Sequence, residues 1–185
     1  MSEPSSLYAR VRLTASAFAA FQASPLTLPG AYTDWHVWLD GQRYYGQISD
    51  DQIATAAHPE PANTVGAYLA ETTAMGTFGL GSHYDPITAT WLFRLIECSE
   101  NYLDFVLILS VLRAVARYKD LPADPTNDDF ILIYPFLWGG DANAYVVITP
   151  GTSYFSATIP PTASQEADAS FTALYEALRA QGDLD

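Results

Sequence analysis

Residues 87–118 read ITATWLFRLIECSENYLDFVLILSVLRAVARY, and they say more about the fold than any other stretch. Ile87 to Cys98 is rich in β-branched and aromatic residues that alternate along the chain, which predicts a central β-strand. Ser99 can accept a hydrogen bond from a first-turn amide, so we expect a helix to follow and to continue to about Tyr118. This helix is apolar nearly all round, which indicates that it packs between layers of the fold.

The N-terminal segment predicts a strand followed by a helix. Residues 7–13 alternate between apolar and polar side chains, which is typical of a half-buried strand with residues such as Tyr8 and Arg10 on its exposed side. Thr14 or Ser16 can then cap a short helix. The sequence thus predicts a β-to-α opening.

The next segment predicts a hairpin and two helices. Residues 35–39 and 42–46 flank an Asp-Gly pair, which tolerates the positive φ values of a tight turn. Asp50 and its acidic neighbour can begin a short helix, and residues 63–75 have the apolar spacing of a second one. Glycines between positions 76 and 81 then indicate an irregular crossing.

The C-terminal part predicts an antiparallel meander and a last amphipathic helix. Strand candidates are residues 130–134, 145–149 and 153–158, joined by turns that contain glycine. Apolar residues recur at helical spacing between positions 171 and 178. Because strands and helices do not alternate regularly, we predict a single α+β domain over residues 1–185, with a mixed, mostly antiparallel sheet packed against helices.

The charge balance is the most unusual bulk property. The chain has 21 acidic residues against 8 basic ones, a formal net charge of −13 and Lys119 as its single lysine. Residues 44–93 and 121–178 contain no lysine or arginine. Such a surface repels nucleic acid and anionic membranes and favours a basic protein partner, although acidic charge also serves solubility alone.

Cysteine content and the N-terminal residues indicate an intracellular protein. Cys98 is the only cysteine, so an intramolecular disulfide is excluded and a reducing compartment is expected. Residues 1–6 lack the basic start and apolar run of a secretory signal, and the longest apolar run is too short for a membrane span. We therefore expect a cytoplasmic location.

The common catalytic motifs are absent from the sequence. Ser82, His83 and Asp85 are the residue types of a hydrolytic triad, but neighbours in sequence generally point in different directions. His36, His58 and His83 show no metal-ligand spacing, and burial of Cys98 is favoured over nucleophilic use. We predict a non-enzymatic protein with no metal and no cofactor, and keep a hydrolase site around His83 and Asp85 as an alternative.

Acidic and aromatic residues together predict a partner-binding face. Carboxylates in predicted loops beside aromatic anchors suit a partner rich in arginine and lysine, while the same aromatic residues can also fill the core. The candidate residues are Asp124, Asp128, Asp129, Tyr134, Trp138, Asp141 and Tyr145. A second, similar patch contains Trp35, Trp38, Tyr44 and Tyr45.

In size, acidity and lack of catalytic motifs the chain resembles the small acidic immunity proteins of bacterial toxin systems. The likeness extends over the whole chain, and no short motif carries it. It implies a protein that binds and neutralises a cognate, basic toxin such as a nuclease. A structural or adaptor subunit of a phage or secretion system is a further alternative, and a homodimer remains open.

Overall fold

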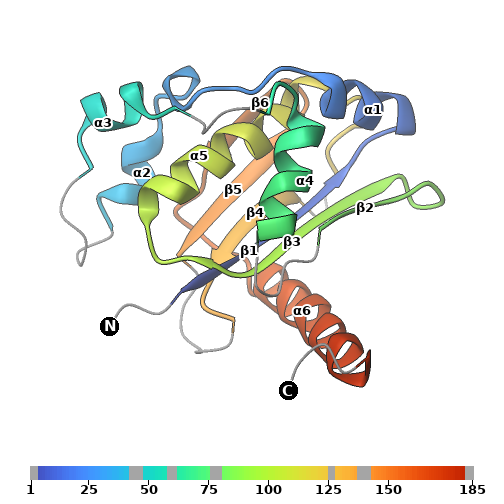
Figure 1. The fold of residues 1–185 in the computed structure, drawn as a ribbon. Coiled ribbons are helices and arrows are strands. Elements are labelled where there is room, and N and C mark those ends of the chain that lie inside the picture. Colours follow the sequence, from blue (N-terminus) through green and yellow to red (C-terminus); the bar gives the residue numbers. More distant parts are fainter. Residues whose placement is uncertain are drawn as a thin grey trace.

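The computed structural model describes residues 4–41, 48–57, 62–75, 81–124, 128–136 and 143–181. A six-stranded sheet lies between several helices on one face and one long helix on the other (Figure 1). The strands are β1 (Ser5–Arg12), β2 (Ser82–Asp85), β3 (Thr90–Ser99), β4 (Asp129–Tyr134), β5 (Ala144–Thr149) and β6 (Thr152–Phe155). The helices are α1 (Ala15–Ala23), α2 (Trp35–Leu39), α3 (Asp50–Thr55), α4 (Val65–Met75), α5 (Tyr102–Arg113) and α6 (Pro161–Gln181), with 3-10 turns η1 (Pro29–Ala31) and η2 (Ala114–Arg117). The predicted α+β class is confirmed.

The sheet has the strand order β2-β3-β1-β4-β5-β6, and each pairing among the described strands is antiparallel. β1 therefore lies inside the sheet and is covered on both faces. Tyr8 and Arg10 are only 2% and 8% exposed, so the prediction of a half-buried β1 is wrong. The alternation of β1 separates two kinds of core: an apolar one towards α5, and an aromatic, partly charged one towards α6.

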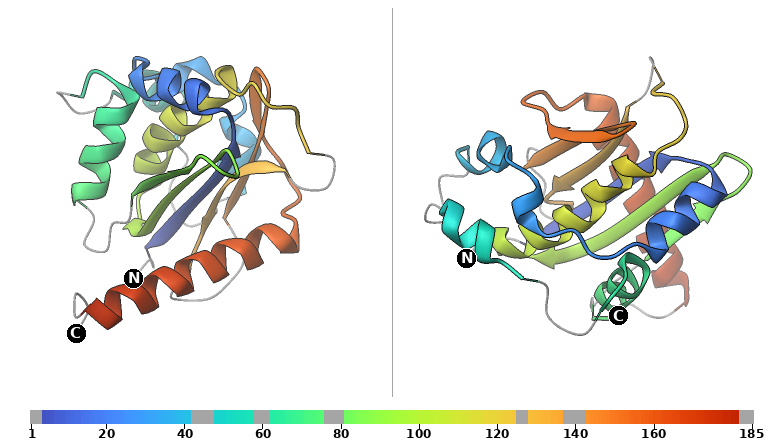
Figure 2. Two further views of the ribbon diagram at one scale, coloured as in Figure 1. Left: turned by 90° about the vertical axis from the view of Figure 1, so that its right-hand side faces the viewer. Right: turned by 90° about the horizontal axis from the view of Figure 1, so that it is seen from above.

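The helix α5 lies across the apolar face of the sheet, as the all-round apolar pattern predicted (Figure 2). Its outer side is covered by the segment between α1 and α2. Ser110 Oγ donates to the carbonyl of Thr27 at 2.8 Å, and the Tyr32 hydroxyl donates to the carbonyl of Ser110 at 3.2 Å. These bonds satisfy polar groups that would otherwise destabilise a buried layer.

The long helix α6 covers the other face of the sheet (Figure 2). Ala163, Ala167 and Phe171 recur every four residues and are buried against the aromatic core of Tyr8, Phe130 and its neighbours. The two alanines let the helix approach closely, while the Phe171 ring packs on Tyr8 at a centroid distance of 6.0 Å.

Two local predictions fail because tertiary packing outweighs the local pattern. Residues 35–39 form α2 and not the first strand of a hairpin; the intended second strand, 42–46, lies outside the described residues. Trp35 and Trp38 are buried there, with the Trp38 ring stacked on Phe155 at 5.5 Å. The predicted strand at 87–98 begins only at Thr90, because residues before it form a turn that joins β3 to the unpredicted strand β2.

Other local signals are confirmed. Thr14 Oγ1 caps α1 by accepting from the amide of Ala17, and the short helix predicted to begin at Asp50 is α3. Its N-cap, Ser49, was not predicted and forms a capping box with Gln52. The helix predicted over 63–75 is α4, and the predicted meander is β4-β5-β6. None of the helices in the described ranges has both the length and the hydropathy of a transmembrane span.

Candidate functional site

Four carboxylates gather at the end of the sheet where β1 ends. Because neighbouring strands are antiparallel, the end of β2 and the starts of β3 and β4 lie at this same end. The acids are exposed or partly exposed, and we call them the acidic rim: Asp85, Asp120, Asp124 and Asp128. Asp120, Asp124 and Asp128 are close in sequence, and the topology brings Asp85 to the same end of the sheet.

Contacts to the last residues of β1 hold the rim together. Asp120 Oδ1 accepts from the amide of Thr14 at 3.0 Å, and Arg12 Nη1 lies 3.2 Å from Asp124 Oδ2. Arg10 Nη2 donates to the carbonyl of Asp128 at 2.6 Å. The turn that contains Asp85 is joined to the same segment, because the amide of Leu13 donates to the carbonyl of Ala89 at 2.9 Å.

A buried charge cluster lies directly beneath the rim and consists of Arg10, Arg12, Lys119 and Asp129. The side chains of Lys119 and Asp129 are both 0% exposed and form an ion pair. Asp129 Oδ1 also lies 3.3 Å from Arg12 Nε and 3.8 Å from Arg10 Nη1. A buried carboxylate with several cationic partners holds the end of β1 against the start of β4.

The prediction that Asp129 lies in a binding loop is wrong. Asp129 is the first residue of β4, and its charge is used inside the fold. Its neighbour Asp128 is exposed, and Asp124 has a side chain that is 30% exposed. Of the predicted acids in the described residues, Asp124 and Asp128 therefore remain available to a partner.

The predicted aromatic anchors Tyr134 and Tyr145 are buried, which matches the alternative that they fill the core. The Tyr145 hydroxyl donates to Asp128 Oδ2 at 3.3 Å, and burial raises the pKa of Tyr145 well above its usual range. Tyr134 lies at the far end of β4, where its hydroxyl donates to Asp168 of α6. Trp138 and Asp141 lie outside the described residues.

Two rim residues were missed as binding candidates. Asp85 begins a turn in which it accepts from the amide of Ile87, and an Asp followed by a proline in a turn is a readable local signal. Asp120 has no such signal, because its place is set by Thr14, 106 positions away. Hydrogen bonds lower the pKa of both carboxyls. The main cause is the bond from the amide of Ile87 for Asp85, and the bond from the Thr14 hydroxyl for Asp120.

Basic residues are mostly directed inward. Of the lysine and arginine residues, all but Arg43 lie in the described ranges. Arg10, Arg113 and Lys119 are buried, Arg12 and Arg94 are half-buried, and Arg117 and Arg179 are exposed. Acidic residues that are exposed in the same ranges are Asp40, Asp50, Asp51, Glu71, Glu100, Asp104, Asp120, Asp128, Asp168 and Glu176. The described surface is therefore more acidic than the composition suggests.

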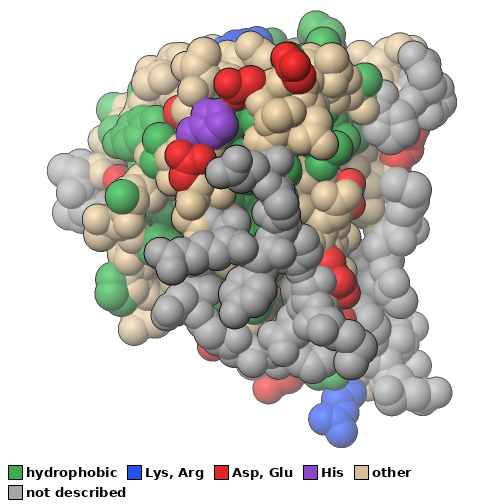
Figure 3. Space-filling model, turned by 90° about the vertical axis from the view of Figure 1, so that its left-hand side faces the viewer, with side chains coloured by type: hydrophobic (Ala, Val, Ile, Leu, Met, Phe, Trp, Pro, Cys, Tyr) green, Lys and Arg blue, Asp and Glu red, His purple; other side chains and the backbone are tan. Residues whose placement is uncertain are grey.

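A second acidic group lies on the face formed by α2 and α3, where Figure 3 shows acidic side chains beside a histidine. His36 Nε2 lies 2.6 Å from Asp50 Oδ1, and His36 Nδ1 lies 3.2 Å from Asp40 Oδ1. These contacts, Asp50 first, raise the pKa of His36. A hollow of about 330 Å³ adjoins them and is lined partly by Tyr32 and Trp35. Tyr44 and Tyr45 of the predicted second patch lie outside the described residues.

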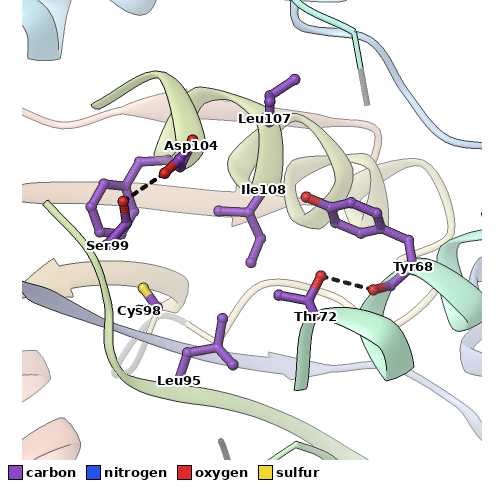
Figure 4. A pocket seen from close by; sticks show the side chains of 9 residues that line it. Tyr68, Thr72, Leu95, Cys98, Ser99, Asp104, Leu107 and Ile108 are labelled. Atoms are coloured by element: carbon purple, nitrogen blue, oxygen red, sulfur yellow. Dashed lines mark hydrogen bonds between the residues drawn. The ribbon is translucent and has the colours of Figure 1, made fainter. Parts of the chain in front are cut away.

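A smaller pocket of about 170 Å³ lies between α4, α5 and the end of β3 (Figure 4). Its polar side chains are already paired: Ser99 Oγ donates to Asp104 Oδ2 at 2.7 Å, and Thr72 Oγ1 donates to the carbonyl of Tyr68 at 2.8 Å. Cys98 Sγ donates to the carbonyl of Ser5, and burial raises the pKa of Cys98 to about 12. A thiol with that pKa is a poor nucleophile at neutral pH.

The residues Ser82, His83 and Asp85 do not converge into a triad. Ser82 Oγ accepts from Trp91 Nε1 at 2.7 Å on the face of the sheet that α5 covers. His83, the next residue of β2, points to the opposite face. Within the described ranges, no three histidine, cysteine or acidic side chains are grouped as metal ligands; His58 lies outside those ranges.

Comparisons with protein-family models, with curated protein sequences and with solved structures each found no match for this chain.

Proposed function

We propose that this chain is an immunity-type protein that binds a basic toxin domain in the cytoplasm of the producing cell and neutralises it by protein–protein contact. The acidic rim is the contact surface in this proposal. Its carboxylates meet lysine and arginine side chains, as the phosphates of a nucleic acid would meet them on a nuclease. The partner is then blocked because its basic surface is covered.

One observation carries the proposal: in the described residues, three of the cationic side chains are buried, whereas most carboxylates are exposed. Arg10 and Lys119 are buried in the charge cluster, and Arg113 pairs with Asp34 at 2.8 Å with its own side chain 1% exposed. The uncompensated exterior favours steering, which raises association rates by roughly 10 to 1,000-fold for an oppositely charged partner.

The rim is also well prepared for binding. Asp120 and Asp128 are held by hydrogen bonds from Thr14 and Tyr145, so little side-chain freedom remains to be lost on association. The lowered pKa values of Asp85 and Asp120 favour the charged form of both carboxylates. Fixed charges on a rigid sheet end suit fast capture and slow release.

The test is a growth assay with a captured partner. The tagged chain is used to isolate a binding protein from the producing cell, and that protein is then expressed alone and together with the chain. We expect growth arrest in the first case and rescue in the second. A captured protein that is acidic, or whose expression does not impair growth, contradicts the proposal.

Matched variants locate the surface. Asp124→Asn combined with Asp128→Asn should slow association with the captured protein several-fold at low salt, and added salt should reduce the difference. Asp40→Asn combined with Asp50→Asn removes the same charge from the α2 and α3 face and is the control. Equal slowing by both pairs would show that net charge alone matters and that the rim is not the contact surface.

A further inference from the structure

The two edges of the sheet differ in whether their backbone groups are occupied. At the β6 edge, the carbonyl of Ser153 accepts from Arg113 Nη2 at 3.0 Å, and the amide of Phe155 donates to Asp34 Oδ2 at 3.1 Å. These groups point away from β5, so the Arg113–Asp34 pair closes this edge against another strand.

The β2 edge is open. The amide of Arg94 donates to the carbonyl of Gly81 at 3.3 Å, so in the antiparallel register His83 and Asp85 direct their backbone groups to β3. Ser82 and Tyr84 direct theirs outward, where no hydrogen-bond partner occurs within the described residues. A row of free amides and carbonyls is a template for strand pairing.

Side chains hold this open edge in place. Ser82 Oγ accepts from Trp91 Nε1 at 2.7 Å, and the Tyr84 hydroxyl donates to the carbonyl of Leu13 at 3.0 Å. The Tyr84 ring is also stacked on Phe18, with centroids 4.9 Å apart. β2 is therefore fixed to the core while its backbone edge stays free, so pairing needs little reorganisation.

The turn beyond β2 adds a rigid apolar tip. Asp85 Oδ1 accepts from the amide of Ile87 and Asp85 Oδ2 from Thr88 Oγ1, both at 2.8 Å. These bonds present Ile87 with 93% of its surface exposed. An apolar side chain fixed at a turn is suited to a pocket on a partner and has no internal packing role.

We infer that the β2 edge takes an extended segment of the basic partner as an added strand, with Ile87 packed against an apolar side chain of that segment. The inference rests on the proposed function and specifies how the partner is held. Charge selects this occupant: Asp85 is the last residue of this edge strand, and a second copy of a chain with net charge −13 would be repelled. Lysine and arginine in the added strand would meet the Asp85 carboxylate.

Amide hydrogen exchange measured by NMR tests the inference, with a short peptide of alternating valine and arginine as the probe. The peptide should slow exchange at Ser82 and Tyr84, whereas its backbone N-methylated form should not. Ser82→Pro removes one outward amide, and Ser82→Ala is the matched control that loses the same side chain but keeps the amide. Ser82→Pro should bind the peptide roughly fivefold more weakly than Ser82→Ala, the value of about one hydrogen bond.

The outcomes separate this inference from the proposed function. Peptide that shifts the rim resonances without protecting Ser82 or Tyr84 overturns the added strand but leaves a basic partner in place. Protection that grows with protein concentration and without peptide would assign the edge to a second copy and also overturn it. The exchange measurement on the unaltered chain decides the question even if Ser82→Pro does not fold.

Discussion

Asp128 and Asp129 are neighbours in the sequence but belong to two different regions of the molecule. Asp129 lies in the buried charge cluster, pairs with Lys119 and has a side chain that is 0% exposed. Asp128 lies in the acidic rim, is exposed, and accepts one hydrogen bond from Tyr145. The difference shows that a strand boundary decides which acid stabilises the fold and which is available to a partner.

The largest effect should come from exchanging the two acids for amides. Asp129→Asn leaves Lys119 and Arg10 buried without their carboxylate, and should lower the free energy of unfolding by about 3 to 5 kcal/mol. Asp128→Asn keeps an acceptor for Tyr145 at an exposed site and should cost less than about 1 kcal/mol. Urea denaturation of both variants measures the two values. Equal decreases in the free energy of unfolding would mean that Asp129 stabilises the fold no more than the exposed Asp128 does.

A second pair of variants compares a buried cation with an exposed one. Arg113 lies between aromatic rings, 4.1 Å above the centroid of Tyr32, and pairs with Asp34, whose side chain is 26% exposed. Arg113→Met should lower the free energy of unfolding by about 2 to 4 kcal/mol. The loss is limited because water can still reach part of the Asp34 carboxylate that Arg113 leaves unpaired. Arg117→Met, at an exposed site, should cost less than about 1 kcal/mol. Thermal unfolding of both variants checks the ranking, and a reversed order would contradict it.

The smallest effect is expected on the exposed α2 and α3 face. A histidine with a raised pKa contributes stability that is present below its ordinary pKa of about 6.5 and is lost as the pH rises through the raised value. Asp50→Asn should lower the pKa of His36 more than Asp40→Asn does, because the contact to Asp50 is the larger cause. NMR titration of the imidazole measures the pKa of His36 in both variants. A larger decrease in Asp40→Asn than in Asp50→Asn would contradict the predicted order.

Local patterns predicted much of the fold, because caps, turns and apolar spacing act over a few residues. The acidic pair at Asp50 predicted the start of α3, and the β4-β5-β6 meander followed from its turns. β1 was predicted half-buried because its alternation is the same whether the polar side faces water or a paired, buried charge. Only the docking of α6, where Glu166 lies 2.6 Å from Arg10 Nε, distinguishes the two cases.

The candidate site was less predictable than the fold. Asp124 and Asp128 were found from charge and loop character, but the rim also needs Asp85 and Asp120, which join it through long-range contacts. Tyr145 was expected as an aromatic anchor and instead supports Asp128 from inside. The number of charges can be read from the sequence, whereas the topology decides which of them lie at the same end of the sheet.

An amide NMR titration with a short oligoarginine peptide measures directly where cationic groups collect on the folded chain. The predicted result is that the largest shifts appear at Asp85, Asp120, Asp124 and Asp128, weaken with salt, and shrink in the Asp124→Asn and Asp128→Asn double variant. Shifts that are spread evenly over the surface, or that centre on Asp40 and Asp50, would contradict a partner-binding rim at the end of the sheet.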